Sequence, residues 1–482
     1  MRRSILPVIV LAVAIAASFL AGQANDAADP NDPAGDDAVS LTTPVLSMRR
    51  TPEWLRQPTT SNLLAAAVQA PIDTVGQAGA VCASVHVNGE PVTDIAATQA
   101  FIPGEIQRLL TVIALDTLGS GGFTTEVVRS GDAVINDEGV LEGDLWLIGG
   151  ADPVLSTDDY ISRFGDDRAF TPLEELVADT VAALRDEGIT AIGGQVIGVD
   201  AKYAGTPQVF GDFWTNAEIA SGTVGVTSGL LVDNGLSSFP TEVDLASDVR
   251  SADGTAHAAS VFASLLNGAE MPVVGGSSAG DAPATISRQS VARISSPPLD
   301  DIAKRALVDG TTAEMLWREI AVRSGNPFGA LAAVNASLVE LGLLPNDEAG
   351  NFPKYDGSGL SLLNRARCDT FTGALDGDAS SLAAESLPPV ETTSLADCAP
   401  AGLTSLHVLA AARPEVTSMA GRAVAGNGDV ITFSMIANWL PGENGAYAPQ
   451  AVCDGLFPAV LEAIADHPAG PLLEQLTPLP AG

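Results

Sequence analysis

The chain has 482 residues, and its 59 Asp plus Glu against 23 Lys plus Arg give a formal net charge of −36. This length exceeds what one hydrophobic core usually serves, so we expect two or more domains. Because binding to a phosphate backbone depends on clustered lysine and arginine, so acidic a chain is a poor candidate for a nucleic-acid partner. We interpret the acidity as a solubility adaptation.

The amino terminus has the pattern of an export signal. Arginines at positions 2 and 3 precede an uncharged run over residues 4–25, with small residues placed like a cleavage site after Ala24. We predict a signal peptide over 1–24. A run close to ~20 residues also fits an uncleaved anchor, which would be the chain's one contact with a membrane. Residues 25–43 are expected to form an acidic disordered tether.

Hydrophobic spacing predicts a mixture of strands and helices in the first half of the chain. Residues 81–92 alternate and contain the turn signal Asn88-Gly89, which is typical of a β-hairpin. Apolar residues at helical spacing predict helices over 106–118 and 173–187, each ended by a glycine, and a strand follows over 194–198.

The second half is helical before it returns to strands. Helices are predicted over 299–308, 312–324, 328–341 and 449–465, and a strand pair over 422–425 and 429–436.

Two groups of residues are candidates for catalysis but lack the pattern that it requires. Gly276-Ser-Ser-Ala-Gly280 matches a hydrolase nucleophile elbow, but that motif needs a following helix, and Asp281-Ala-Pro-Ala does not begin one. We interpret it as a loop, and Ser278 as a loop residue. The four histidines, at positions 86, 257, 407 and 467, show no local pattern of a catalytic triad.

Four blocks of sequence carry a resemblance to a known family. They are Gly143–Leu155, Gly188–Asp200, Ser295–Leu299 and Tyr355–Arg365, the last beginning Tyr-Asp-Gly-Ser-Gly-Leu-Ser. In this order and spacing they resemble the D-alanyl-D-alanine carboxypeptidase/endopeptidase family, the class C low-molecular-mass penicillin-binding proteins. The resemblance runs from about residue 62 to about residue 467.

The resemblance implies an α+β fold. A penicillin-binding, serine β-lactamase-like domain with a mixed sheet flanked by helices would be built from residues 44–118 plus 291–470. A large, mainly β inserted lobe would interrupt it over 119–290, and residues 471–482 would form a tail. The family also implies an exported bacterial protein of the cell envelope.

The first catalytic motif of that family, a serine and a lysine one helical turn apart, is degenerate here. Aligning Pro103 and Leu109 with the family places Glu105 at the serine position and Arg108 at the lysine position. A glutamate is a poor nucleophile toward amides, and a guanidinium with a pKa above ~12 cannot act as a base near neutrality. We interpret Glu105 and Arg108 as a helical ion pair.

The second and third motifs are degenerate as well. Ala313 and Glu314 fix the register of the second motif, which leaves Val308 for its serine and Gly310 for its asparagine. The third motif, Lys-Thr-Gly, falls near Leu409, Ala410 and Ala411. The three lysines of the chain follow Val199, Asp301 and Asn351 by three residues, so no Ser-x-x-Lys exists anywhere in it.

One family block is retained, with Asp356, Gly357, Ser358 and Gly359. We interpret it as a tight turn in which glycines take unusual backbone angles and Asp356 and Ser358 cap neighbouring amides. No catalytic role is assigned to Ser358.

The four cysteines form an even set in a chain predicted to be exported, which favours disulfides over a metal site because no Cys-x-x-Cys spacing is present. The element order of the resembled fold implies the pairs Cys82–Cys453 and Cys368–Cys398. No metal and no cofactor is expected.

Two functional hypotheses follow. In the first, the protein is a catalytically inactive pseudoenzyme that binds a peptidoglycan peptide or a partner protein in the cell envelope. In the second, it is an active serine-type D-Ala-D-Ala carboxypeptidase/endopeptidase with a relocated nucleophile. The missing motifs favour the first.

Overall fold

The computed structural model describes a set of ranges that leaves out both ends of the chain: 53–74, 80–117, 119, 121–165, 169–203, 214–220, 222–239, 249–282, 287–325, 329–376, 381–393, 395–400, 402–413, 415–438 and 455–468. The predicted signal peptide (1–24), tether (25–43) and tail (471–482) therefore lie outside the described residues. Residues 57–470 form one compact unit. Within the described ranges, no helix is both long and apolar enough to cross a membrane.

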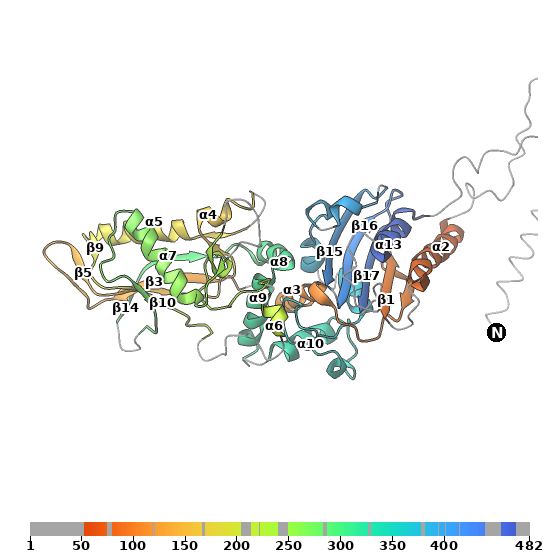
Figure 1. The fold of residues 1–482 in the computed structure, drawn as a ribbon, viewed down its shortest axis with the longest axis horizontal. Helices are drawn as coiled ribbons and strands as arrows, with labels where there is room; N and C mark the ends of the chain where they lie inside the picture. The colour runs from red at the N-terminus through yellow and green to blue at the C-terminus, as the bar shows by residue number, and fades with distance from the viewer. Residues whose placement is uncertain are drawn as a thin grey trace, which may run out of the picture. The chain divides into compact units, whose positions relative to one another are not determined.

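The first sheet has five strands in the order β15-β16-β17-β1-β2 (Figure 1). Their bounds are β1 Val81–Val87, β2 Glu90–Ile95, β15 Ser405–Arg413, β16 Val416–Val424 and β17 Val430–Asn438. Chain segments far apart in sequence meet where β1 pairs with β17, from Val81 opposite Ala437 to Val87 opposite Ile431. This pairing confirms that the predicted hairpin and the last strands share one sheet.

All strand pairs of this sheet are antiparallel. The mixed sheet that the resemblance implied is therefore corrected for this part of the chain. The reason is connectivity, because β1 with β2 and β15 with β16 and β17 are successive strands joined by short connections, which favour antiparallel neighbours.

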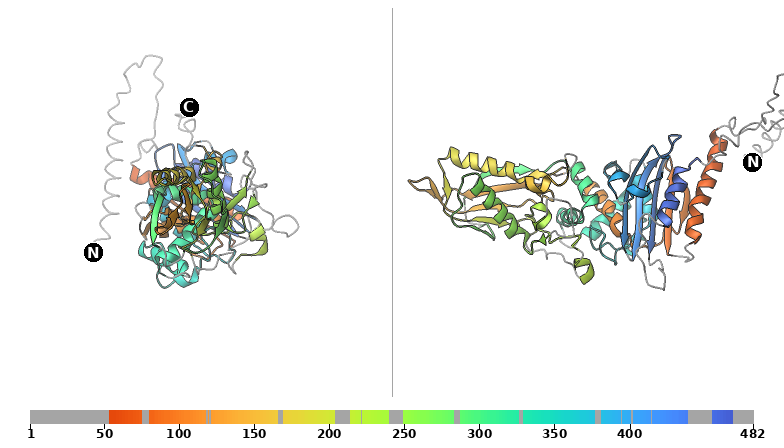
Figure 2. Two further views of the ribbon diagram at one scale, coloured as in Figure 1. Left: turned by 90° about the vertical axis from the view of Figure 1, so that its left-hand side faces the viewer. Right: turned by 45° about the horizontal axis from the view of Figure 1, so that its top comes forward.

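Helices cover both faces of this sheet, as Figure 2 shows. On one face, apolar residues of α2 (Glu53–Thr74) and α13 (Leu456–Ala465) pack in a core with side chains of β1, β16 and β17. On the other face lies a larger core, formed by α3 (Gln107–Thr117), α8 (Leu299–Val308), α9 (Gly310–Arg323), α10 (Ala330–Glu340), α11 (Cys368–Leu375) and α12 (Ser381–Glu385). The helices predicted over 106–118, 299–308, 312–324 and 328–341 all belong to this second layer.

A second five-stranded sheet belongs to the lobe between the two parts of the first. Its order is β13-β10-β6-β3-β14, with β3 Thr124–Ser130, β6 Leu145–Ile148, β10 Val196–Val199, β13 Ser277–Ala279 and β14 Arg288–Ser295. Its pairs are parallel on the β13-β10-β6 side and antiparallel on the β6-β3-β14 side. Helices α5 (Leu173–Asp186) and α7 (Gly254–Gly268) pack on it. Because β14 continues to Ser295, the sheet extends past residue 290, and the exact domain division stays a prediction.

Smaller elements complete the lobe and the connections. They are β4 Val134–Ile135, β5 Val140–Glu142, β7 Leu155–Ser156, α4 Asp158–Ile161, β8 Thr171–Pro172, β9 Ala191–Ile192, α6 Asn216–Ala220, η2 Asp233–Gly235, β11 Leu236–Ser238 and β12 Val249–Arg250, with the short 3-10 helices η1 Gly104–Ile106, η4 Ala349–Asn351, η6 Val390–Thr392 and η7 Ala396–Cys398.

The disulfide of the described residues joins Cys82 to Cys368. Both pairs implied by the resemblance, Cys82–Cys453 and Cys368–Cys398, are therefore wrong. The reason is the alternation of β1: Cys82 faces the core that contains α11, whereas its neighbours Val81 and Ala83 face the core that contains α13. Cys453 and the side chain of Cys398 lie outside what the structure describes.

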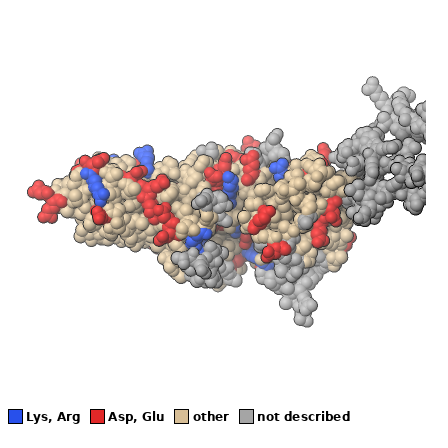
Figure 3. Space-filling view, turned by 90° about the horizontal axis from the view of Figure 1, so that it is seen from above, with Lys and Arg blue, Asp and Glu red and all other residues tan. Residues whose placement is uncertain are grey.

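On the one face that Figure 3 shows, the negative charge is not gathered in a single patch. On the face shown in Figure 3, Asp and Glu occur from one end of the described chain to the other, with Lys and Arg interspersed. This distribution agrees with the interpretation of the acidity as a solubility feature.

Candidate functional site

The degenerate first motif lies where η1 runs into α3. Glu105 belongs to η1, and Arg108 lies in the first turn of α3, with 26% and 3% of their side chains exposed. Glu105 Oε2 is 3.5 Å from Arg108 Nη2. The helical ion pair predicted from the sequence is therefore confirmed.

Arg108 also ties α3 to two other segments. Its Nε donates to the carbonyl oxygen of Ser358 at 3.1 Å, and its Nη1 donates to that of Leu307 at 3.1 Å. Arg108 therefore acts as a structural clamp, and a guanidinium offers N–H donors but no acceptor for a nucleophile's proton.

The degenerate second motif lies at the junction of α8 and α9. Val308 is the last residue of α8 and is 38% exposed, while Asp309 caps α9 by accepting from the Thr312 N–H at 2.7 Å. A Cβ at Gly310 would lie 2.9 Å from Val224 Cγ2 and 3.3 Å from Arg108 Nη2. The place of the family's asparagine side chain is thus filled by residues of this chain.

The degenerate third motif lies on β15, which pairs only with β16 among the described strands and packs beside η1. Leu409 and Ala411 are buried, and Leu409 belongs to the core of the helical layer, whereas Ala410 contacts the core on the opposite face. These apolar side chains offer no charge and no hydroxyl. Arg413, the last residue of the same strand, donates to the carbonyl oxygens of Gly359 and Leu360.

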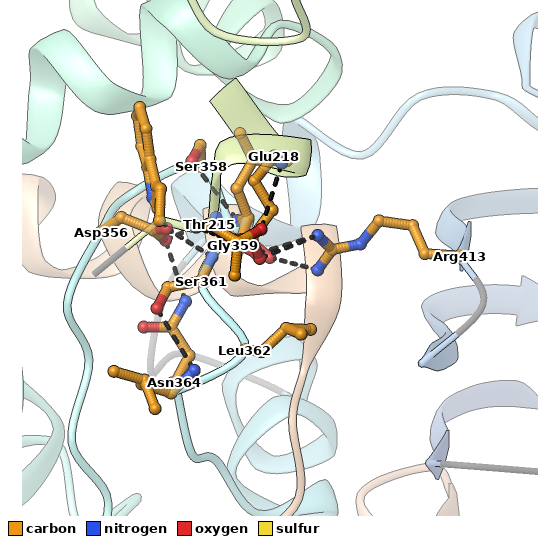
Figure 4. Close-up of polar contacts among 12 residues, drawn as sticks. Thr215, Glu218, Asp356, Ser358, Gly359, Ser361, Leu362, Asn364 and Arg413 are labelled. Carbon is orange, nitrogen blue, oxygen red and sulfur yellow. Dashed lines mark hydrogen bonds and ion pairs between the residues drawn. The ribbon is translucent and has the colours of Figure 1, made fainter. Parts of the chain in front are cut away.

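The retained block forms a loop over residues 356–361, called here the 356–361 loop. Asp356 holds it from within: Oδ1 accepts from the Gly359 N–H at 2.8 Å and from Asn364 Nδ2 at 2.9 Å, and Oδ2 accepts from the Ser361 N–H at 2.7 Å (Figure 4). Gly359 has φ +84°, and a Cβ there would lie 2.1 Å from the Gly104 carbonyl oxygen. A glycine is therefore required by both backbone angle and space.

Ser358 is fully buried, and its Oγ accepts from the Leu360 N–H at 3.4 Å. Asp356 and Ser358 thus cap neighbouring amides, as the sequence predicts.

The carbonyl oxygens of this loop also have partners. The carbonyl oxygens of residues 356, 357 and 358 accept from Gln107 at 3.4 Å, Thr111 at 3.2 Å and Arg108 at 3.1 Å, respectively. Those of residues 359 and 360 both accept from Arg413, at 2.8 and 2.9 Å. Figure 4 shows Arg413 reaching the loop from β15. With its carbonyls and amides paired inside the chain, the loop is a rigid structural element.

Glu314 supports the same loop from α9. Its Oε2 accepts from the Gly357 N–H at 3.0 Å and the Ser358 N–H at 3.3 Å. Burial and the nearby charge of Asp356 raise the pKa of Glu314 to about 8. In the sequence, Glu314 marks only the register of the second motif. Its position in that family block was the signal that could have indicated this role.

A segment of the inserted lobe packs against the 356–361 loop. We call residues 214–220 and 222–225 the covering segment. Trp214 Nε1 donates to Asp356 Oδ2 at 2.6 Å, and Trp214 packs in a small core with Val224 and Leu360. Glu218 Oε1 lies 3.9 Å from Arg413 Nη1 (Figure 4). No sequence motif marks these residues, because they approach the loop from a distant part of the chain.

A relocated nucleophile would need a base within hydrogen-bond reach, and two described serines bear on this. Ser278 lies on β13, so its interpretation as a loop residue is wrong. Its Oγ donates to Gln195 Oε1 at 3.0 Å, and no described base forms a hydrogen bond with it. Ser84 Oγ lies 3.5 Å from His86 Nε2, and His86 Nδ1 contacts Asp376 Oδ2, which is a serine–histidine–aspartate arrangement that local sequence patterns did not reveal.

This arrangement is not poised as a catalytic triad. Ser84 is fully buried and donates its hydroxyl proton to Asp94 Oδ1 at 2.7 Å rather than to His86. A nucleophile must reach its substrate and must donate its proton to the base, and Ser84 does neither here.

Comparison with known proteins decides the family. The model of the D-Ala-D-Ala carboxypeptidase 3 (S13) family matches residues 61–246 and 243–388. The chain belongs to this family. The matched ranges include Glu105, Arg108, Gly310 and the 356–361 loop. No curated protein matches the sequence.

Solved structures show the same fold. Penicillin binding protein 4 from Haemophilus influenzae is 18% identical, with a TM-score of 0.61, over 82% of this chain and 98% of that one. The same protein complexed with a β-lactam gives 17% identity and a TM-score of 0.55 over the same shares. At this identity the likeness establishes the penicillin-binding fold, with its extra mainly β lobe, and the chain is a member of a cell-wall peptidase family.

Proposed function

We propose that this protein is an exported, cell-envelope member of the D-Ala-D-Ala carboxypeptidase family that has lost acyl-enzyme chemistry and acts by binding. The observation that carries the proposal is the ion pair between Glu105 and Arg108 at the positions of nucleophile and base. Acyl transfer needs a hydroxyl that attacks a carbonyl and a neutral amine or imidazole that takes its proton. These two side chains supply a carboxylate and a permanent cation instead.

The surroundings of that ion pair support the proposal independently. Gly310 is packed against Val224 and Arg108, and Leu409 and Ala411 are buried apolar residues. Restoring one catalytic group would therefore leave the other two motifs without function. Groups that act as a unit in catalysis are strongly non-additive.

We infer that the ligand is a peptidoglycan stem peptide or an envelope protein. Family membership supports a cell-wall peptide, since the fold is shared with enzymes named for D-Ala-D-Ala substrates. The covering segment packs on the loop that this peptide would approach, so we expect it to compete with peptide binding. Removing the contact between Glu218 and Arg413 should weaken this competition.

The test compares peptide binding by three forms of the protein. A muramyl-pentapeptide mimic is titrated into the wild type, Glu218→Ala and the control Glu391→Ala, which removes an exposed carboxylate from η6, a part of the chain separate from the covering segment. We expect saturable, non-covalent binding that is tighter for Glu218→Ala alone. Absence of binding to all three forms would rule out the peptide and leave the envelope protein, to be sought by cross-linking in intact cells.

Export is part of the proposal and has its own test. Cell fractionation should place the mature protein outside the cytoplasmic membrane, and amino-terminal sequencing should begin at Asn25 if the signal is cleaved. Recovery in the cytoplasm would contradict this part of the proposal.

The alternative is an active carboxypeptidase with a relocated nucleophile. The arrangement of Ser84, His86 and Asp376 is the observation in its favour, and the buried, donating state of Ser84 is the observation against it. Release of D-alanine that disappears in Ser84→Ala would establish the alternative.

A further inference from the structure

Strand β13 forms one edge of the second five-stranded sheet, with β10 on one side and no described strand on the other. The two strands run parallel. Val196 of β10 donates to the carbonyl oxygen of Gly276 at 3.0 Å, and Gly280 donates to that of Gly198 at 3.0 Å. Because successive residues of a strand direct their backbone groups to opposite sides, residues 276, 278 and 280 face β10.

The backbone groups of Ser277 and Ala279 therefore point away from the sheet. Within the described ranges, their N–H and C=O groups form no hydrogen bond with another segment. Ala279 is exposed and Ser277 is partly exposed, so solvent reaches this side of the strand. A row of unpaired donors and acceptors of this kind is a template for one more strand.

The other three edges of the two five-stranded sheets are protected. The edge strand β14 carries two arginines and a register shift, and the edge strand β2 begins with Glu90-Pro91. On β15, the Val408 N–H donates to the carbonyl oxygen of Pro388 at 3.0 Å, so another segment covers part of that edge. Charges, prolines, irregular pairing and covering segments are the means by which proteins block strand edges. Residues 273–280 have neither a charge nor a proline.

Side chains at this edge add two further features. The Val274 N–H donates to the carbonyl oxygen of Ile192 at 2.8 Å, so residues 274–280 form one continuous edge, called here the β13 edge. Val274 is 74% exposed and is the most exposed large hydrophobic residue in the described part of the chain. An exposed acidic residue lies beyond each end of the edge, Glu270 on one side and Asp281 on the other. Neither forms an ion pair with a described residue.

We propose that the β13 edge binds an extended peptide segment of another protein, with basic residues on both sides of an uncharged stretch, as an added strand. The unpaired backbone groups pair with the main chain of the peptide, and Val274 contacts one of its apolar side chains. Glu270 and Asp281 attract the basic residues at the two ends. A second copy of this chain fits less well, because two molecules with a net charge of −36 repel each other. The proposal does not depend on the proposed function.

The first test varies the peptide. A fluorescent probe with the sequence Lys-Lys-Thr-Val-Thr-Val-Thr-Val-Lys-Lys is titrated with the full chain, and its anisotropy is measured. One control peptide has glutamate in place of every lysine, and another is methylated at all six central amide nitrogens. We expect saturable binding of the lysine peptide that weakens at 1 M salt, at least about tenfold weaker binding of the methylated peptide, and no binding of the glutamate peptide.

The second test varies the strand. Ala279→Pro removes an N–H that points to solvent and leaves the bonds to β10 in place, and proline is tolerated at such edge positions. The control Ala279→Ser keeps the N–H. We expect about tenfold weaker binding of the lysine peptide by Ala279→Pro, unchanged binding by Ala279→Ser, and the circular dichroism of the wild type in both.

The methylated peptide needs no variant, so it keeps the test decisive if Ala279→Pro misfolds. No saturable binding of the lysine peptide, equal binding of either control peptide, or equal effects of Ala279→Pro and Ala279→Ser in folded protein would each overturn the proposal. Analytical ultracentrifugation covers the remaining occupant. A dimer of the wild type that Ala279→Pro dissociates would show that a second copy occupies the β13 edge, and would also overturn the proposal.

Discussion

Trp214 of the inserted lobe donates its indole N–H to Asp356 Oδ2 at 2.6 Å. The residues are 142 positions apart, and both are buried. Asp356 is also the residue that holds the 356–361 loop together from within. One carboxylate therefore couples the inserted lobe to the loop that the family retains.

Replacing Trp214 by phenylalanine should destabilise the protein by about 1–3 kcal/mol, because the ring remains while a charged acceptor loses a donor. The measurement is the free energy of unfolding in urea. Trp146→Phe is the matched control, since Trp146 is buried and its Nε1 has no hydrogen-bond partner among the described residues. Equal losses in the two variants would show that the hydrogen bond to Asp356 contributes nothing.

Glu314 provides a prediction on pH. Its pKa is raised from 4.5 to about 8, by burial first and by Asp356 second. An acid whose pKa is raised by folding binds more protons in the folded state than in the unfolded state. The contribution of Glu314 to stability therefore falls as the pH rises from about 4.5 to about 8. Glu314→Gln removes this loss, so the variant should gain stability relative to the wild type across that interval.

The control for this prediction is Glu314→Ala, which leaves the amides of Gly357 and Ser358 without their acceptor. It should be less stable than Glu314→Gln by about 1–3 kcal/mol at every pH, because neither variant titrates at this position. Urea unfolding at several pH values measures both variants. A constant difference between Glu314→Gln and the wild type would mean that Glu314 is ionised in the folded protein.

His86 responds to pH in a way that can be measured. Burial lowers its pKa, but the hydrogen bond and charge of Asp376 outweigh burial, and the net pKa is raised above 6.5. The stabilisation from the pair is therefore complete below about pH 6.5 and is lost as pH rises through the raised pKa.

The stability difference between wild type and His86→Gln should accordingly shrink as the pH rises from about 5.5, one unit below the ordinary histidine pKa of 6.5, to about 9. In an Asp376→Asn background the same histidine replacement should lose most of this pH dependence. A difference that grows with pH would contradict the assignment.

The fold was largely predictable from the sequence, because the periodicity of α3, α8, α9 and α10 and the blocks near residues 143–155 and 355–365 are local signals. The ion pair of Glu105 and Arg108 was predictable for the same reason, since residues three apart on a helix are neighbours.

The disulfide and the contacts between distant segments could not be predicted, because they depend on which faces of the helices and strands meet in the folded chain. Alternation along β1 directs Cys82 to α11, and no local pattern says which helix covers that face. Trp214, Arg413 and the pair of His86 with Asp376 likewise join segments far apart in the chain. The burial that shifts the pKa of Glu314 is a property of the assembled core and has no counterpart in the sequence alone.

The disulfide gives a direct chemical prediction. Peptide mapping without reduction should yield a peptide pair linked through Cys82 and Cys368. The bond closes a separation of 286 residues, and the double variant Cys82→Ala/Cys368→Ala should lose about 2–5 kcal/mol of unfolding free energy. A linked pair containing Cys82 and Cys453 would contradict the structure.

The central claim is the loss of acyl-enzyme chemistry, and labelling with a fluorescent penicillin followed by intact-mass analysis tests it most directly. The wild type and Glu105→Ser should both remain unlabelled, because Arg108 cannot accept a proton and positions 308, 310 and 409–411 supply no catalytic group. A known penicillin-binding protein serves as the positive control. A stoichiometric adduct on any serine of the wild type, with Ser84, Ser278 and Ser358 as the residues to map first, would contradict the account.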